Sequence, residues 1–149
     1  MEKEIRELVT KYIKGEVERD FLIQIADKYY NLKVYHKESA FYNLLEELFE
    51  DPDDNELQIT RDSIIQVLDN FIKKTITLED VELWFWDVFD LNILGEDSEQ
   101  ELIIYLLHLF DNIEINGITD IHIIKVIETL KCTSNSEKAE KKIQKIFAN

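Results

Sequence analysis

Apolar side chains recur every three or four residues along almost the whole chain, which restricts it to a fold of packed helices. In the first such segment, Ile5, Val9, Tyr12 and Ile13 fall on one face of a helix. One proline and three glycines in 149 residues leave few points at which a helix must break. The spacing therefore predicts an all-α protein, and the length is sufficient for one domain with its own core.

Breaking and capping residues divide this pattern into separate helices. Gly15 can end the first helix, and the third must end before Pro52, because the residue before a proline avoids the helical conformation. Thr60, Thr77 and Ser98 have side chains suited to helix N-termini. Helices are expected near residues 5–13, 18–31, 37–50, 61–74, 78–91, 99–110, 120–131 and 137–147. Since no linker rich in proline or glycine separates them, residues 1–149 are predicted to form a single-domain antiparallel bundle of seven to eight helices.

The segment from Ile113 to Thr119 fits two structures. Asn116-Gly117 between β-branched residues is typical of a β-hairpin. The alternative is a loop leading to a helix capped by Thr119. We prefer the helix, because Ile121 and the apolar residues that follow it continue a helical stripe.

A weak internal repeat is present at an offset of 59 residues. Residues 11–20 and 70–79 both carry an aromatic-Ile-Lys helix end, a polar turn and the start of a second helix. Two related helical hairpins followed by C-terminal helices would explain the similarity. The alternative is that any two amphipathic hairpins look this similar.

The net charge of −15 is concentrated in one region of the chain. Residues 75–124 contain twelve acids and no lysine or arginine, whereas the residues outside 38–124 hold 10 acids and 14 bases. A run of one charge sign destabilises a compact domain by self-repulsion, so a basic protein partner is the simplest explanation. The balance argues against nucleic acid and anionic membranes as direct ligands, because phosphate binding requires basic patches.

Three features predict a cytoplasmic protein. Cys132 is the single cysteine, so no disulfide framework exists, and we expect it to be a packed small side chain. The N-terminal residues 1–5 lack the apolar region of a secretory signal. No apolar run approaches the roughly 18 residues of a membrane span.

The sequence contains no recognisable arrangement of catalytic residues. His36, His108 and His122 are far apart and have no metal-ligand spacing, and no glycine-rich phosphate loop or nucleophile elbow is present. His108 is expected to be a core or boundary residue of an apolar helix. We therefore predict neither an enzyme nor a bound cofactor.

A calcium site is an alternative that the first acidic loop suggests. Asp51, Asp53, Asn55 and Asp62 fall on positions 1, 3, 5 and 12 of an EF-hand loop. Glu56, however, occupies the position at which glycine makes the sharp turn. We predict no metal site and keep a calcium-binding helical protein as an alternative function.

The acids form three groups: the loop near residues 46–56, the helix expected at 78–91, and the start of the next helix. Acids near a helix N-terminus complement the helix dipole, which accounts for Glu79. The dipole does not account for Asp87 and Asp90, which fall in the C-terminal half of their helix.

Trp86 falls on the side of this helix opposite its expected core face of Val81, Trp84, Phe85 and Val88. A tryptophan flanked by carboxylates on a surface helix fits an interface anchor, and the alternative is packing beneath a neighbouring helix. The predicted partner-binding residues are Glu47, Glu50, Asp51, Asp53, Asp54, Glu56, Glu79, Glu82, Trp86, Asp87, Asp90, Glu96 and Asp97.

Several spaced motifs resemble those of the colicin-like bacterial immunity proteins, which protect a cell against its own bacteriocin or contact-delivered toxin. The motifs are Tyr12-Ile-Lys-Gly-Glu16 with Phe21, Phe41-x-x-Leu44-Leu-x-x-Leu48-Phe49-x-Asp51-x-Asp53, Ile76-Thr-Leu-Glu-Asp-Val81-x-x-Trp84 and Leu102-x-x-Tyr105-Leu-x-x-Leu109. The similarity extends over roughly residues 8–130 and continues through Ile124, Val126, Ile127 and Leu130.

The resemblance implies a non-enzymatic inhibitor that binds the catalytic domain of a toxin, often a basic nuclease. Carboxylates would then occupy the place of the nucleic-acid phosphates and occlude the active site. A DNA mimic of the anti-restriction type, acting on a nucleic-acid-binding host protein, would use the same charge complementarity and remains an alternative.

Overall fold

The computed structural model describes residues 3–30, 37–49, 58–89, 91–93 and 95–148. The described residues form eight helices and one minimal pair of strands, so the all-α prediction is confirmed. The helices are α1 (Lys3–Ile13), α2 (Arg19–Tyr30), α3 (Lys37–Phe49), α4 (Arg61–Ile72), α5 (Leu78–Val88), α6 (Asp97–Phe110), α7 (Asp120–Cys132) and α8 (Ser136–Ile146). Strands β1 (Gln58–Ile59) and β2 (Asn92–Ile93) pair in parallel, which the sequence pattern did not predict.

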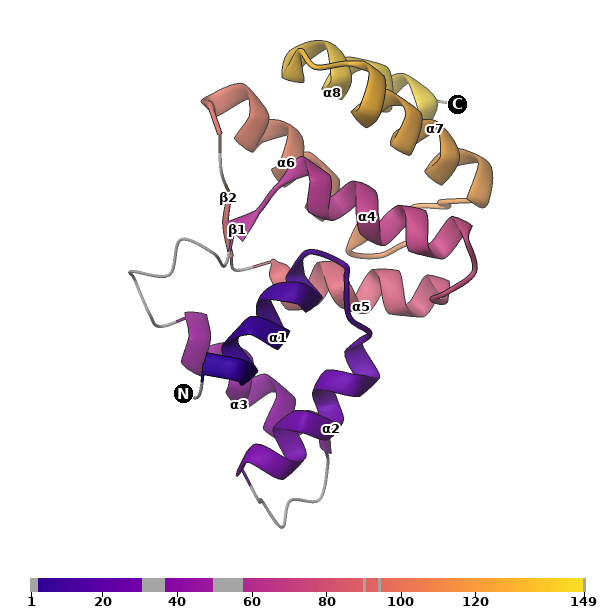
Figure 1. Cartoon of the computed structure of the whole chain (residues 1–149). Helices are drawn as coiled ribbons and strands as arrows, with labels where there is room; N and C mark the ends of the chain where they lie inside the picture. Colours follow the sequence, from indigo (N-terminus) through magenta and orange to yellow (C-terminus); the bar gives the residue numbers. More distant parts are fainter. Residues whose placement is uncertain (1–2, 31–36, 50–57, 90, 94, 149) are drawn as a thin grey trace.

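The α4–α5 hairpin lies between the other helices (Figure 1). On one side are α1, α2 and α3, with α2 packed against both α1 and α3. On the other side, α6 packs on α5, α7 packs on α4, and α8 covers α6 and α7. The α4–α5 hairpin is therefore covered by neighbours on two sides, and part of α5 faces solvent.

Three of the four predicted helix caps, Thr60, Thr77 and Thr119, are confirmed. The hydroxyl of Thr77 accepts a hydrogen bond from the Asp80 amide over 3.2 Å, while the Asp80 carboxylate accepts from the Thr77 amide over 2.9 Å. Thr60 and Thr119 cap α4 and α7 through their hydroxyl groups, and no hairpin forms before α7, where residues 111–117 are turns. The prediction that Ser98 caps α6 is wrong, because α6 begins at Asp97.

The α1–α2 and α4–α5 hairpins share one turn geometry at the offset of 59 residues. Gly15 and Lys74 occupy equivalent places and both have left-handed backbones, with φ of 78° and 64°. Helix ends and helix starts are also equivalent in the two hairpins. Matching hydrogen bonds close the turns: Gly15 N to Tyr12 O (3.0 Å) and Lys74 N to Phe71 O (2.9 Å), with Glu16 N to Lys11 O (2.8 Å) and Thr75 N to Asn70 O (3.0 Å). The structural similarity behind the sequence repeat is therefore present, and a common origin stays a prediction.

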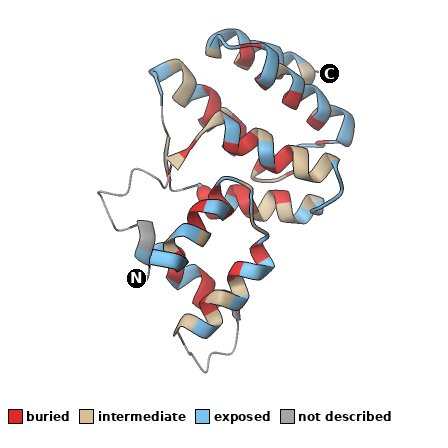
Figure 2. Cartoon of the chain, viewed as in Figure 1, coloured by how far each residue is buried: buried red, intermediate tan, exposed pale blue. Residues whose placement is uncertain are grey.

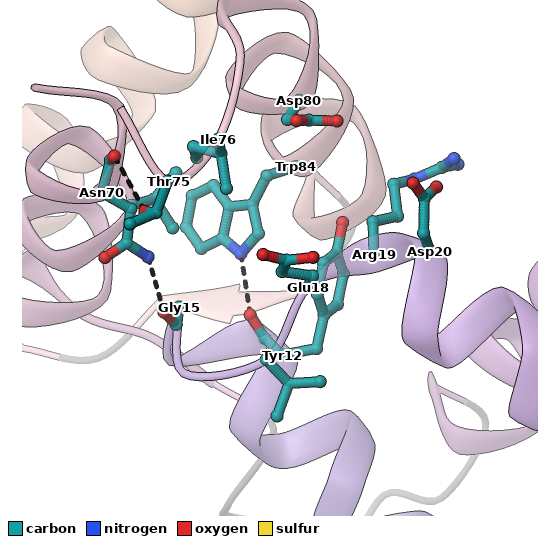
Figure 3. Close-up of a pocket in the computed structure, with 12 residues that line it drawn as sticks. Tyr12, Gly15, Glu18, Arg19, Asp20, Asn70, Thr75, Ile76, Asp80 and Trp84 are labelled. Atoms are coloured by element: carbon teal, nitrogen blue, oxygen red, sulfur yellow. Dashed lines mark hydrogen bonds between the residues drawn. The ribbon is translucent and has the colours of Figure 1, made fainter. Parts of the chain in front are cut away.

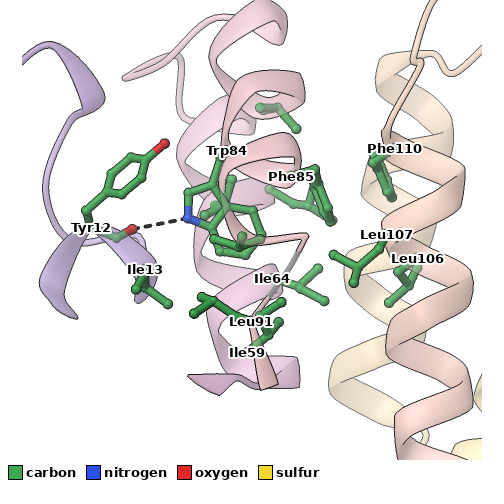
Figure 4. Packing of buried hydrophobic residues seen from close by; sticks show 14 of the residues in the cluster. Tyr12, Ile13, Ile59, Ile64, Trp84, Phe85, Leu91, Leu106, Leu107 and Phe110 are labelled. Atoms are coloured by element: carbon green, nitrogen blue, oxygen red, sulfur yellow. Dashed lines mark hydrogen bonds between the residues drawn. The ribbon is translucent and has the colours of Figure 1, made fainter. Parts of the chain in front are cut away.

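The buried apolar side chains form one cluster to which all eight described helices contribute (Figure 2). At its centre, the rings of Phe85 and Phe110 stack with centroids 4.8 Å apart, joining α5 to α6 (Figure 4). Trp84 meets Phe85 edge to face and donates its indole Nε1–H to the carbonyl oxygen of Tyr12 over 3.1 Å. The predicted core face of α5 is confirmed, because Val81, Trp84, Phe85 and Val88 are all buried.

Cys132, expected to be packed, and His108, expected in the core or at its boundary, both lie at the surface. Cys132 is exposed at the end of α7. His108 is exposed on α6, where its ring meets Phe89 edge to face at 5.5 Å. Among the described residues, no helix combines the length and the apolar content needed to cross a lipid bilayer.

Candidate partner-binding surface

The turn segment 111–118 runs along one side of α5 in the opposite direction. The indole Nε1 of Trp86, near the end of α5, donates a hydrogen bond to the carbonyl oxygen of Asp111 over 2.6 Å. One turn earlier on α5, the Oε2 atom of Glu82 accepts from the backbone N–H of Ile113 over 3.2 Å. These two contacts hold the segment to the helix, and we call their joint solvent-facing side the α5 surface.

An open groove of about 560 Å³ lies in the α5 surface, between the first turns of α5 and the end of the segment. Its apolar lining, which we call its base, consists of the half-buried Leu78 and the buried Ile113 and Ile118. Carboxylates of Glu79, Glu82 and Glu114 surround them, and none of the described lining residues is basic. The groove is lined by Leu78, Glu79, Glu82, Ile113, Glu114, Gly117, Ile118 and Thr119. Its chemistry is thus an apolar base under a negatively charged rim.

Trp86 faces solvent from the same surface, with 63% of its area exposed. Its indole nitrogen is held by Asp111, so the ring is fixed in place while its faces remain accessible. The alternative in which Trp86 packs beneath a neighbouring helix is therefore wrong. Phe89, three residues further on, is 43% exposed, and Ile115 in the segment is 80% exposed. Exposed aromatic and aliphatic groups beside carboxylates are the composition expected of an interface core with a charged rim.

Asp87 is not part of this surface, and its prediction as an exposed partner-binding acid is wrong. Its carboxylate is buried and accepts hydrogen bonds from the Arg19 guanidinium, from Nε at 2.8 Å and from Nη2 at 3.4 Å. The hydroxyl of Tyr12 donates to the same carboxylate. Arg19 also donates to the Tyr42 hydroxyl over 3.1 Å and stacks over the Phe41 ring at 4.7 Å. The pair joins the N-terminal helices to α5.

Protonation equilibria follow from this burial. Burial raises the pKa of Tyr12 well above its usual value, and the neighbouring Asp87 charge adds to the effect, so the phenol stays neutral. Burial disfavours the charged form of Arg19, but the hydrogen bond and charge of Asp87 outweigh it and raise the pKa of Arg19 above its usual value. The network is therefore a fixed ion pair with a neutral phenol donor.

The sequence marks each of these two charges as unusual, but not their pairing. Arg19 is the first residue of α2, where a cation is unfavourable, and Asp87 lies in the last turn of α5, where an anion is unfavourable. Each of these two charges is unfavourable at its own helix end, and they pair with each other across the core. The ion pair thereby fixes the position of α5, and with it the position of the α5 surface.

The remaining predicted residues do not gather at one place. Glu79, Glu82 and Trp86 belong to the α5 surface, whereas Glu47 is exposed on α3. Glu96 and Asp97 are exposed at the start of α6, one helix length of about 21 Å from the segment that follows Phe110. Figure 1 shows this start at the opposite end of α6. Six predicted residues lie outside the described residues: Glu50, Asp51, Asp53, Asp54, Glu56 and Asp90.

A second, smaller pocket of about 70 Å³ lies where the turns of the two hairpins meet (Figure 3). The Asn70 side chain crosses this seam and donates to the carbonyl oxygen of Gly15 over 2.8 Å. Tyr12, Arg19 and Trp84 line the pocket from the core side. Its volume accommodates a few water molecules, so it is a packing seam and too small for a metabolite.

The calcium alternative gains no support from the described residues. Asp62 is exposed in the first turn of α4, and the other three proposed ligands lie outside the described residues. Within the described ranges, no group of three or more His, Cys, Asp or Glu side chains is placed to hold a metal ion. Comparison of the chain with models of protein families, with curated proteins and with solved structures found no match.

Proposed function

We propose that this chain is an immunity-type inhibitor, without enzymatic activity, that binds a basic toxin domain in the cytoplasm and occludes its active site. The observation that carries the proposal is the α5 surface. It exposes Trp86 beside a groove with three carboxylates, and it derives from a 50-residue stretch that has no lysine or arginine. The resemblance to colicin-like immunity proteins supports the same proposal.

Each part of the surface has a physical role in this function. The regional negative charge accelerates encounter with a basic partner by electrostatic steering. Trp86 is held by Asp111 before binding, so little conformational entropy is lost when a partner covers it. Carboxylates at the rim of the groove would pair with cations that otherwise contact nucleic-acid phosphates. A partner bound in this way cannot bind its own substrate.

Co-expression with the product of the adjacent gene tests the proposal. If that product is a toxin, cells carrying both genes grow, cells carrying the toxin gene alone do not, and the two proteins co-purify. A charge-reversed chain, Glu79→Lys with Glu82→Lys, is expected to lose protection, whereas Glu96→Lys with Glu101→Lys retains it. Absence of a toxin domain in the neighbouring product and of any co-purified basic protein would contradict the proposal. Binding to a restriction enzyme instead would favour the DNA-mimic alternative.

A further inference from the structure

We infer that the groove of the α5 surface takes a single arginine or lysine side chain of the partner, with its methylene stem on the apolar base and its charge among Glu79, Glu82 and Glu114. This inference rests on the proposed function, because it assumes that the partner is a basic protein. It goes further by naming the group that is bound and the place that binds it.

The shape of the groove suits a long side chain with a charged end. A volume of about 560 Å³ exceeds what one side chain fills, so a basic residue and part of its backbone can enter together. The apolar floor that a methylene stem can contact comes from the half-buried Leu78, because Ile113 and Ile118 are only 2% and 6% exposed. Arginine and lysine bury their methylene stems on such floors while their charged ends remain near water.

The charges of the groove exclude other occupants of similar size. Glu79 and Glu114 are exposed, and Glu82 is half-buried, so all three can approach a cation. Glu82 is oriented by the Ile113 amide, which donates to its Oε2 atom over 3.2 Å. An acidic side chain would be repelled here, and an uncharged polar side chain would gain a hydrogen bond to a carboxylate but no charge attraction. A cation gains the attraction of carboxylates held on two different elements, α5 and segment 111–118.

The position of Trp86 also favours an arginine or lysine carried by a protein over a free small molecule. The indole lies one helical turn beyond Glu82, outside the groove lining, and remains accessible. A partner whose basic residue enters the groove can therefore cover Trp86 with a neighbouring apolar residue. A free cation would leave the indole exposed.

The test uses the full chain and two matched probes. N-acetyl-arginine amide carries one positive charge, and N-acetyl-citrulline amide has nearly the same shape without it. Each is titrated into the ¹⁵N-labelled protein at low salt while backbone amide shifts are followed. The arginine probe is expected to move the signals of residues 78–82 and 113–119 with millimolar affinity, and the citrulline probe is expected to leave them unchanged. Glu79→Gln with Glu114→Gln should weaken the arginine probe about fivefold or more, because each close carboxylate contributes to the attraction.

The control variant removes the same charge elsewhere. Glu96, the N-cap residue of α6, and Glu101, within α6, are both exposed, so Glu96→Gln with Glu101→Gln should change the affinity by less than twofold. Equal weakening by both variants, equal shifts from both probes, or shifts centred on α6 would each overturn the inference. Groove shifts that depend on protein concentration without a probe would assign the groove to a second copy and also overturn it. Failure of co-purification with the adjacent gene product would instead contradict the proposed function and leave a positive probe result intact.

Discussion

Replacing Asp87 by asparagine removes the negative charge opposite Arg19 while preserving the size of the side chain. The side chains of Arg19 and Asp87 are 5% and 1% exposed, so water cannot solvate the Arg19 guanidinium once the opposite charge is removed. Breaking a buried ion pair by removing one partner costs about 3–5 kcal/mol. Arg19 keeps its contact with the Phe41 ring at 4.7 Å, which favours the lower end of that range. We therefore expect Asp87→Asn to lower the free energy of unfolding by about 3 kcal/mol.

Urea unfolding followed by the circular dichroism of the helices measures this loss. With a slope of about 2 kcal/mol per molar urea, the unfolding midpoint of Asp87→Asn should fall by about 1.5 M. Glu114→Gln, which neutralises an exposed acid, should change the unfolding free energy by less than about 0.5 kcal/mol. The double variant Arg19→Met with Asp87→Leu should be more stable than Asp87→Asn, because no unpaired charge remains in the core. A shift of Asp87→Asn as small as that of Glu114→Gln would refute the buried-pair argument.

Three further predictions concern backbone strain, alkaline pH and the surface tryptophan. In urea unfolding, Gly15→Ala should destabilise the fold by about 2 kcal/mol and Gly117→Ala by about 1 kcal/mol. Both glycines have left-handed backbones, but of the two only Gly15 has a neighbour that an added Cβ would meet, Gln66 Cγ at 3.0 Å. Equal losses of stability in the two variants would contradict this. Because the pKa of Tyr12 is raised, the folded state keeps a proton that the unfolded state releases above about pH 10, and stability should decline as pH rises beyond that value. The decline should be smaller in Tyr12→Phe when unfolding is measured at about pH 9 to 11.5. Identical alkaline slopes for the two proteins would disprove the assignment. Trp86→Ala should cost about 1 kcal/mol or less because the side chain is 63% exposed, and a loss above 3 kcal/mol would place it in the core.

Local features of the sequence were sufficient to predict most helices. The apolar spacing and the cap residues Thr60, Thr77 and Thr119 act within a few positions of the chain, so their effect survives folding. The same helical period places Trp86 opposite the core face of α5, but it does not decide between exposure and packing beneath a neighbouring helix; the structure shows exposure. Ser98 shows the limit of this reasoning, because a residue type suited to capping lies two residues after the actual N-cap, Glu96.

Contacts between distant parts of the chain were not predictable from the same local patterns. The Arg19–Asp87 pair spans 68 residues, so the sequence pattern cannot distinguish a charge that is paired in the core from a functional surface charge. The pairing of β1 with β2 involves two residues per strand, too few to produce an alternating pattern. The groove depends on where segment 111–118 lies against α5, which tertiary packing decides. Sequence reasoning thus identified the helix that carries the candidate site but not the second element that completes it.

Hydrogen exchange of the chain, free and in complex with the product of the adjacent gene, tests the central claim most directly. The amides of α5 and of segment 111–118 should exchange more slowly in the complex, because the partner covers Trp86 and the groove between these two elements. The amides of α8, which packs on the far side of the molecule against α6 and α7, should be unchanged. Protection confined to α7 and α8, with α5 and segment 111–118 exchanging as in the free protein, would contradict the account.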